Sequence, residues 1–230
     1  MTDSPSTWVA VLFTDVVGST RLWAEHHDAM ASDLAIHDGL LRDAIAAHGG
    51  RVFSTAGDAF AAAFPSASQA VDAAIDGQRA MSDTPWSVPG GIQIRTAVHA
   101  GEVIERGGDY FGPTLNTGAR VLSAGHGGQV LVTAGVATAI PHPSTDLGAH
   151  RLRDIETPVR IHQLRAPGLE EEFPPLASLA SGQSRLPQHR SSFVGRADEM
   201  RNLRQMLHDS RLVTVTGVGG VGKTRIAVEV

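Results

Sequence analysis

Residues 49–64 have the sequence GGRVFSTAGDAFAAAF. Two strand-like runs, RVFST and AFAAAF, flank the pair Ala56-Gly57, and this pattern predicts an antiparallel hairpin folded back at a tight turn. The residue that leaves the turn is Asp58. Its carboxylate has two possible uses: it can bond to the backbone of its own turn, or it can face a charged partner.

The sequence on the N-terminal side predicts a strand followed by a long helix. Residues 8–14, WVAVLFT, form a short apolar run that predicts a buried strand. The run ends at Asp15, and the small-residue turn VVGST follows it. Apolar residues then recur at helical spacing from Leu22 to Ala47, and HGG ends this helix near Gly49.

On the C-terminal side, helices and strands continue to alternate. The expected elements are a helix over 66–81 capped by Ser66 or Ser68, a strand over 92–103, a flexible arm over 105–113, a helix over 114–125, a strand over 128–133, and two short strands between 147 and 164. This order predicts an α+β domain with a ferredoxin-like βαββαβ core. We expect its helices to cover one face of a largely antiparallel sheet.

Composition divides the chain into three parts. Residues 1–165 form the first domain, and residues 166–192, rich in Pro, Ser and acidic residues, are typical of a linker. Residues 193–230 begin a second unit, in which a strand-like run over 211–216 leads into GVGGVGKT. We expect the first unit to carry the main function.

The stretch GVGGVGKT fits the phosphate-loop pattern G-x-x-x-x-G-K-[ST] from Gly217 through Gly222 to Thr224. In such a loop Lys223 reaches the β and γ phosphates, and the Thr224 hydroxyl helps to hold Mg²⁺. Only six residues follow Thr224, so no second acidic strand can supply the metal site. We therefore expect no competent ATPase from this segment as it stands.

The overall composition excludes several classes of protein. With 42% hydrophobic residues and a net charge of −5, the chain is typical of globular protein and unlike a protein that coats nucleic acid. No apolar run approaches the roughly 20 residues that span a bilayer, and no basic leader precedes a cleavage site. Cysteine is absent. We expect a cytoplasmic protein that binds neither membranes nor nucleic acid.

Two carboxylates are the first candidates for chemistry. If the first strand lies beside the hairpin, Asp15 and Asp58 reach the same edge of the sheet, and neither has an obvious basic neighbour in sequence. Such a pair suits hard cations such as Mg²⁺, and the small residues Gly18 and Ser19 let backbone amides approach a polyphosphate. The alternative is a pair of turn aspartates with local backbone bonds, and spacing alone leaves both open.

Several blocks in fixed order carry a family resemblance. FTDVVGST, GGRVFSTAGDAFAAAF, GDYFGPTLNTGARVLSAGHGGQVLVT and LGAHRLRDIETPVRIHQL follow one another with ordinary loop lengths. Together they closely resemble the catalytic domain of class III nucleotidyl cyclases, in the bacterial adenylate cyclase branch where such a domain precedes a large ATPase. The resemblance covers roughly residues 6–165.

The resemblance implies conversion of ATP to 3′,5′-cyclic AMP and pyrophosphate, with two Mg²⁺ or Mn²⁺ ions per active site. It implies a head-to-tail homodimer with active sites at the interface. One subunit would supply Asp15, Asp58 and the backbone carbonyl of Val16 as metal ligands. The other would supply Asn116, which orients the ribose, and Arg120, which stabilises charge developing on the phosphates.

Three further positions complete the expected site. Arg153 lies where the family often has a lysine for the terminal phosphates, although a strand-edge arginine is nearly as good an interpretation. Ser54 stands where the family usually has an adenine-selecting lysine, whereas its acidic partner is present as Asp109. A serine satisfies a base edge less fully than lysine does.

The expected consequence is cyclic AMP synthesis with relaxed selectivity, acceptance of GTP, or very low activity. The alternative from another class is a degenerate cyclase domain that dimerises and senses nucleotides for a regulatory partner.

Overall fold

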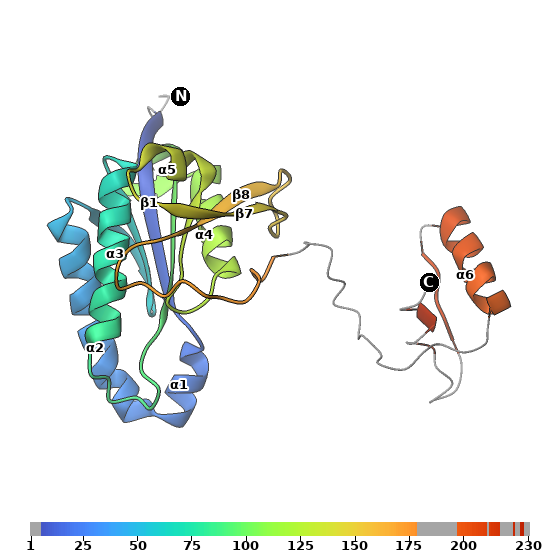
Figure 1. Ribbon diagram of the computed structural model, residues 1–230, viewed down its shortest axis with the longest axis horizontal. Helices are drawn as coiled ribbons and strands as arrows, with labels where there is room; N and C mark the ends of the chain where they lie inside the picture. Colours follow the sequence, from blue (N-terminus) through green and yellow to red (C-terminus); the bar gives the residue numbers. More distant parts are fainter. Residues whose placement is uncertain (1–5, 179–196, 211, 217–222, 224–225, 228–230) are drawn as a thin grey trace. The chain divides into compact units, whose positions relative to one another are not determined.

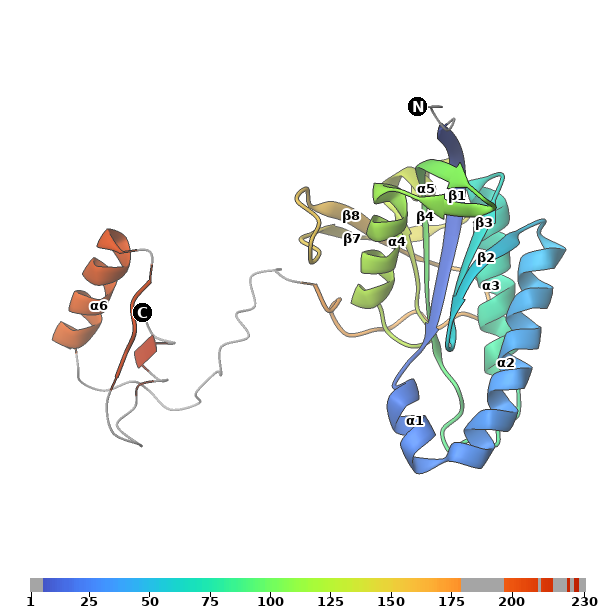
Figure 2. The same ribbon diagram turned by 180° about the vertical axis from the view of Figure 1, so that it is seen from behind.

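The computed structural model describes residues 6–178, 197–210, 212–216, 223 and 226–227. Contacts divide the chain into two units, residues 1–181 and 182–230, and each is considered by itself. Figures 1 and 2 show the first unit as a sheet with helices on both sides.

The first unit alternates strands and helices along the chain. Its elements are β1 (Ser6–Val16), α1 (Ser19–Glu25), α2 (His27–Ala47), β2 (Arg51–Ala56), β3 (Ala59–Phe64), α3 (Ala67–Asp83), β4 (Ile94–Arg106), β5 (Asp109–Phe111), α4 (Pro113–Ala124), β6 (Val130–Thr133), α5 (Ala134–Ala139), β7 (Ser144–His150) and β8 (Val159–Leu164).

The strands form one sheet in the order β2-β3-β1-β4-β6-β8-β7, and β5 pairs with β4 outside this path. Strands β4 and β6 are parallel, whereas the other pairs described are antiparallel. The expected α+β fold with a largely antiparallel sheet is confirmed. The predicted hairpin is β2–β3, and its turn places Gly57 at φ 64°, a left-handed conformation that suits glycine.

Strand β1 is buried on both faces of the sheet. Ala10 and Leu12 belong to a core with α2 and α3, whereas Val11 and Phe13 belong to a core that includes Val121 of α4. Figure 1 shows α3 in front of the sheet, and the reverse view in Figure 2 shows α4 in front. The prediction that helices cover one face was wrong, because a strand with apolar residues on both sides needs cover on both sides.

Two further expectations for local structure need correction. The long helix predicted from Leu22 to Ala47 is interrupted at His26, whose φ of −140° separates α1 from α2. The arm over 105–113 is not a loose segment, because β5 pairs with β4. Tyr110 is buried there, with its ring 5.1 Å from that of Phe53 on β2, and this packing holds the arm against the sheet.

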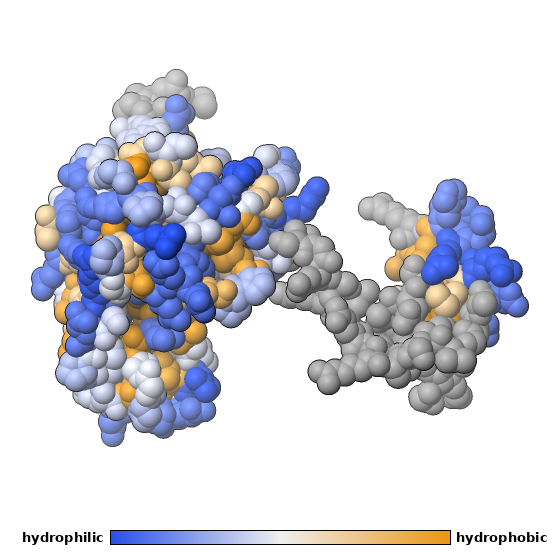
Figure 3. Space-filling view, in the orientation of Figure 1, coloured by the Kyte–Doolittle hydropathy of each residue, from blue (hydrophilic) through white to orange (hydrophobic). Residues whose placement is uncertain are grey.

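Helix α3 begins as the sequence predicts. The Ser66 side chain accepts a hydrogen bond of 3.3 Å from the Gln69 amide, so Ser66 rather than Ser68 is the cap. The helix buries one side against the sheet. Figure 3, in the same orientation, shows hydrophilic and hydrophobic residues mixed over α2 and α3, as expected for the outer faces of such helices.

Residues 166–178, here called the C-terminal strap, pack on the first unit although the sequence predicts a linker from residue 166. Two nitrogens of Arg79 on α3 donate to the Pro167 carbonyl at 3.0 and 2.7 Å. Further along, the Ala177 amide donates to the Ala124 carbonyl at the end of α4 at 2.9 Å. Figure 1 shows this segment in orange as it leaves β8 and passes α3. The first unit thus extends beyond residue 165.

The second unit contains helix α6 (Ala197–Asp209). Residues 212–216 adopt no strand, contrary to the prediction for 211–216, because no neighbouring strand pairs with them among the residues described. No helix in the described part of the chain is long and apolar enough to cross a bilayer.

The close packing of α4 on the sheet gives a first testable prediction. A Cβ added at Gly118 would lie 2.2 Å from Cε2 of Phe13, so Gly118→Ala must displace the ring or the helix. We expect a loss of about 1–3 kcal/mol in the free energy of unfolding, measured by urea titration.

Gly39→Ala is the matched control. Gly39 also lies in a helix, but a Cβ there meets no atom within 4 Å. It should raise the free energy of unfolding by about 0.5–1 kcal/mol, because alanine loses less conformational freedom on folding. Equal stabilisation by both substitutions would contradict the close packing of α4 on β1.

Candidate functional site

The Asp58 carboxylate points away from its own turn. Its Oδ2 accepts a hydrogen bond of 3.1 Å from the backbone amide of Val16, 42 residues earlier at the end of β1. Because Val16 directly follows Asp15, the carboxylate of Asp58 lies beside the backbone next to Asp15. The two acidic residues therefore lie at the same end of the sheet, where β1 ends and the β2–β3 hairpin turns.

Asp15 has a basic partner that the sequence did not reveal. In the β1–β4 pairing Asp15 lies opposite Arg95. The guanidinium donates from Nε to Oδ1 at 2.7 Å and from Nη2 to Oδ2 at 2.5 Å, so both carboxylate oxygens are engaged. The side chains of Asp15 and Arg95 are only 24% and 28% exposed, respectively, which strengthens their attraction relative to a fully solvated pair. Arg95 thus neutralises the carboxylate in the lone chain.

The donor set suits hard divalent cations. Asp15 and Asp58 offer carboxylate oxygens, which Mg²⁺ and Mn²⁺ prefer. Among the described residues no group of three or more His, Cys, Asp or Glu side chains could hold a metal. A pair of carboxylates fits a cation that takes its other ligands from phosphate, backbone and water. The predicted role of the Val16 carbonyl stays a prediction, as do the roles of Gly18, in a left-handed conformation with φ 67°, and of Ser19 at the start of α1.

Helix α4 presents the predicted pair Asn116 and Arg120. Asn116 is exposed, and Arg120 donates from Nη2 to Oδ2 of Asp154 at 2.6 Å. Arg153 is largely exposed and its Nε lies 3.6 Å from the same oxygen of Asp154. Asp154 thus lies between two arginines that the sequence assigned to phosphate binding, and the sequence analysis had missed it.

The predicted base-binding residues lie on β2 and β5, which do not pair with each other in the sheet. Ser54 is exposed on β2, and Asp109 begins β5, with its carboxylate accepting a bond of 2.9 Å from the Tyr110 amide. The adjacent residues Phe53 and Tyr110 bring the two strands into contact. Whether Ser54 and Asp109 bind a base stays a prediction.

The predicted phosphate loop lies mostly outside the described residues. Gly217, Gly222 and Thr224 are not described, and Lys223 is described without the rest of its loop. A phosphate site there stays a prediction from sequence.

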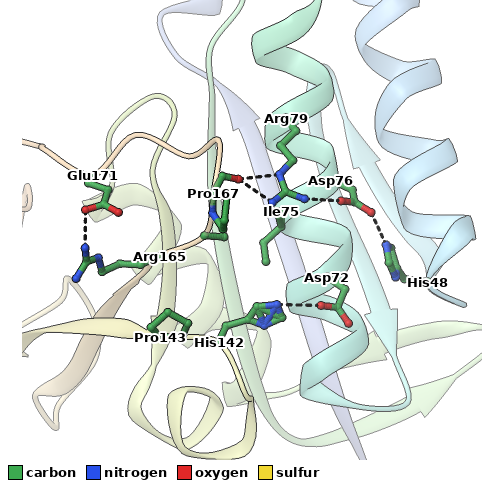
Figure 4. Close-up of a pocket in the computed structure, with 11 residues that line it drawn as sticks. His48, Asp72, Ile75, Asp76, Arg79, His142, Pro143, Arg165, Pro167 and Glu171 are labelled. Carbon is green, nitrogen blue, oxygen red and sulfur yellow. Dashed lines mark hydrogen bonds and ion pairs between the residues drawn. The ribbon is translucent and has the colours of Figure 1, made fainter.

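A separate hollow of about 560 Å³ lies between α3, the α5–β7 loop and the C-terminal strap. Figure 4 shows that its charged and imidazole side chains bond to one another or to backbone: His142 faces Asp72, His48 and Arg79 face Asp76, and Arg165 faces Glu171. This hollow includes none of the predicted site residues. The strap is held at this hollow by the two hydrogen bonds from Arg79 to the Pro167 carbonyl, and the charged side chains around the hollow already have partners.

Comparison with known proteins gives the family. Residues 1–158 match the model of the adenylate and guanylate cyclase catalytic domain. The chain belongs to this family. An uncharacterized protein of Mycobacterium tuberculosis (strain ATCC 25618 / H37Rv) is 39% identical over 201 residues, covering 84% of this chain and 68% of its own length. A receptor-type adenylate cyclase of Trypanosoma congolense is 32% identical, covering 69% of this chain but 28% of its own length.

Solved cyclase structures share the fold of this cyclase-family domain. An adenylate cyclase from Trypanosoma brucei, solved in its monomeric state, superposes with a TM-score of 0.69 at 27% identity, covering 75% of this chain and 95% of its own. Class III cyclases are lyases that act on ATP or GTP as dimers and generally use two divalent metals. The family match ends at residue 158, and neither it nor the described residues support a following P-loop ATPase domain.

The Arg95–Asp15 pair generates a prediction about metal binding. Because Arg95 engages both oxygens of Asp15, a divalent cation must compete with the guanidinium for them. Arg95→Gln should therefore raise the affinity for Mn²⁺, measured without nucleotide by electron paramagnetic resonance titration, by about fivefold, as expected for loss of a competing ion pair worth about 1 kcal/mol.

Arg160→Gln is the control, since Arg160 pairs with Asp146 on the β7–β8 hairpin. It should leave Mn²⁺ affinity unchanged. Unchanged or weaker Mn²⁺ binding by Arg95→Gln would show that the ion pair does not compete with the metal.

Proposed function

We propose that the chain is a nucleotidyl cyclase that converts ATP to 3′,5′-cyclic AMP and pyrophosphate. The ribose 3′ oxygen attacks the α-phosphorus, the bond from this phosphorus to the bridging oxygen of the β-phosphate breaks, and the 3′ hydroxyl proton is released. The observation that carries this proposal is the hydrogen bond from the Val16 amide to Asp58, which puts this carboxylate beside the backbone next to Asp15, within a domain of the cyclase family.

The carboxylate edge would hold the cations. Asp15 and Asp58, with the Val16 carbonyl, would coordinate two Mg²⁺ or Mn²⁺ ions, which when bound activate the attacking oxygen and neutralise phosphate charge. Arg95 would leave Asp15 as the cations bind. Phosphate oxygens then become the favoured partner of its guanidinium, because they accept charge-assisted bonds in the same forked geometry. Gly18 and Ser19 would bring backbone amides close to the phosphates.

The helix α4 pair would act on the reacting centre of a partner subunit. Asn116 would orient the ribose through its amide, and Arg120 would bridge oxygens that gain negative charge in the transition state. Their separation of four residues puts both on one face of α4, where both are accessible at least in part. Arg153 would add a positive charge at the terminal phosphates.

An exposed apolar cluster supports assembly into a homodimer. Trp8, Ile104 and Phe111 are 53%, 46% and 49% exposed, respectively. Ile104 lies opposite Phe111 in the β4–β5 pairing and diagonally from Trp8 in the β1–β4 pairing, so the three side chains share one face of the sheet. A cluster of large apolar side chains at a strand end is typical of a protein interface.

Base selection would depend on Ser54 and Asp109. Ser54 offers one hydroxyl where a lysine would offer three donors and a charge. We infer a cyclase that discriminates poorly between ATP and GTP, because rejection of the wrong base depends on polar groups left unpaired.

The experiment is a turnover assay of the purified chain with Mn²⁺ or Mg²⁺ and with ATP or GTP, scored by chromatography of the cyclic products. Asp15→Asn and Asp58→Asn should each lower kcat by at least about a hundredfold, since each removes a charged ligand from the phosphate site. The matched control is Asp146→Asn, on the distant β7–β8 hairpin. Absence of cyclic product from both nucleotides would refute the catalytic proposal.

The second candidate is a degenerate, dimerising module that binds nucleotides for a regulatory partner. The specific observation in its favour is Ser54 at the base site. Such a module would bind ATP, but it would release no cyclic product in the turnover assay. A P-loop ATPase segment after residue 193 rests on the motif GVGGVGKT alone.

A further inference from the structure

Arg120 is held by a carboxylate from another part of the fold. Its Nη2 donates to Oδ2 of Asp154 at 2.6 Å, across 34 residues of sequence. The side chains of Arg120 and Asp154 are 38% and 65% exposed, respectively. Solvent therefore screens the pair, and it contributes little to the stability of the fold. Its main effect is to restrict a long, flexible side chain to one orientation.

The backbone at Asp154 is specialised for this contact. Asp154 has φ 59° and is the only non-glycine among the described residues with a positive φ. This left-handed conformation is unfavourable for most side chains, although Asp and Asn tolerate it best. Residues held this way persist when their surroundings impose the geometry, and they gather at functional sites.

The surroundings of Asp154 impose that geometry. The Ile155 amide donates to the Leu152 carbonyl at 3.3 Å and closes a turn around Asp154. Leu152 is buried, and Ile155 packs against the same core that contains Val121 and Leu122 of α4. The turn and the helix thus share one core, so the carboxylate is fixed relative to the helix that carries Arg120.

We propose that Asp154 is a positioning residue for Arg120 in the cyclisation reaction. The inference rests on the proposed function, because it gives Arg120 the task of stabilising charge on a partner's phosphates. A guanidinium has five N–H donors in a rigid plane. The contact with Asp154 uses one nitrogen, Nη2, so the N–H donors of Nε and Nη1 stay available to phosphate oxygens while Asp154 sets the direction of the plane.

Asp154 is suited to orientation rather than to binding nucleotide. A carboxylate placed directly against phosphates would repel them, whereas here the charge is paired with Arg120 and lies 3.6 Å from Nε of Arg153. Loss of Asp154 therefore leaves the positive charges in place and removes only their alignment. Alignment of reacting groups affects the chemical step more than substrate affinity.

The test compares two substitutions at the same backbone conformation. Asp154→Gly keeps the positive φ and removes the acceptor, whereas Asp154→Asn tolerates the positive φ and keeps a carbonyl oxygen for Arg120. With ATP and Mn²⁺, Asp154→Gly should lower kcat about tenfold with KM changed less than twofold, and Asp154→Asn should retain most of kcat.

Asp146→Asn is the matched control. Asp146 also pairs with an exposed arginine, Arg160, and its pKa is held below its usual range by that arginine and by the Gly148 amide. The pair lies on the β7–β8 hairpin, and Arg120 is paired with Asp154 rather than with Asp146. Its loss should leave kcat unchanged, so a general effect of removing a surface carboxylate is excluded.

A second measurement does not depend on turnover. The Nε–Hε signal of Arg120 in ¹⁵N NMR spectra, assigned by its loss in Arg120→Lys, should report an ordered side chain in the wild-type chain and in Asp154→Asn, and a mobile one in Asp154→Gly. If the wild-type chain makes no cyclic product, the proposed function fails, and this measurement alone decides whether Asp154 orients Arg120.

Three results would overturn the proposal. They are an unchanged kcat in Asp154→Gly when the wild type is active, equal losses in Asp154→Gly and Asp146→Asn, and an Arg120 side chain that is equally ordered in wild type and Asp154→Gly.

Discussion

The pairing of β1 with its neighbours is the constraint on which the rest of the fold depends. This strand is hydrogen-bonded to β3 on one edge and to β4 on the other, and it is packed by helices on both faces. Its register with β4 puts Arg95 opposite Asp15, and a shift of one residue would turn Asp15 to the other face. The β3 pairing brings the hairpin and Asp58 to the same end. The geometry of the candidate site therefore follows from the registers of one strand.

The charged residues of this site already have partners in the single chain. Asp15 pairs with Arg95, Asp58 accepts from the Val16 amide, and Arg120 pairs with Asp154. These contacts offset the repulsion that two carboxylates at one edge would otherwise create. Formation of a catalytic complex would thus give these charged side chains new partners rather than bring unpaired charges together, which limits the free energy gained on assembly.

Sequence patterns predicted the structural features that depend on residues close together in the sequence. The glycine turn, the alternating strands and the Ser66 cap follow from neighbouring residues, and the position of Asp15 and Asp58 at strand ends followed from the hairpin. Arg95 was missed because it lies 80 residues from Asp15, and no local pattern sets the register between their strands. The unbroken apolar run of β1 indicated that both faces of this strand are covered. No feature of the sequence indicated the left-handed turn at Asp154.

The C-terminal strap has a composition typical of a linker, yet it is part of the fold. Phe173 stacks on His126, Leu176 enters the core shared with α4, and the Ser178 hydroxyl lies 2.9 Å from Nδ1 of His150 at the end of β7. Ser178 therefore lies beside the end of β7 rather than beyond the tip of β8, and truncation directly after β8 would uncover the core surface that Leu176 protects.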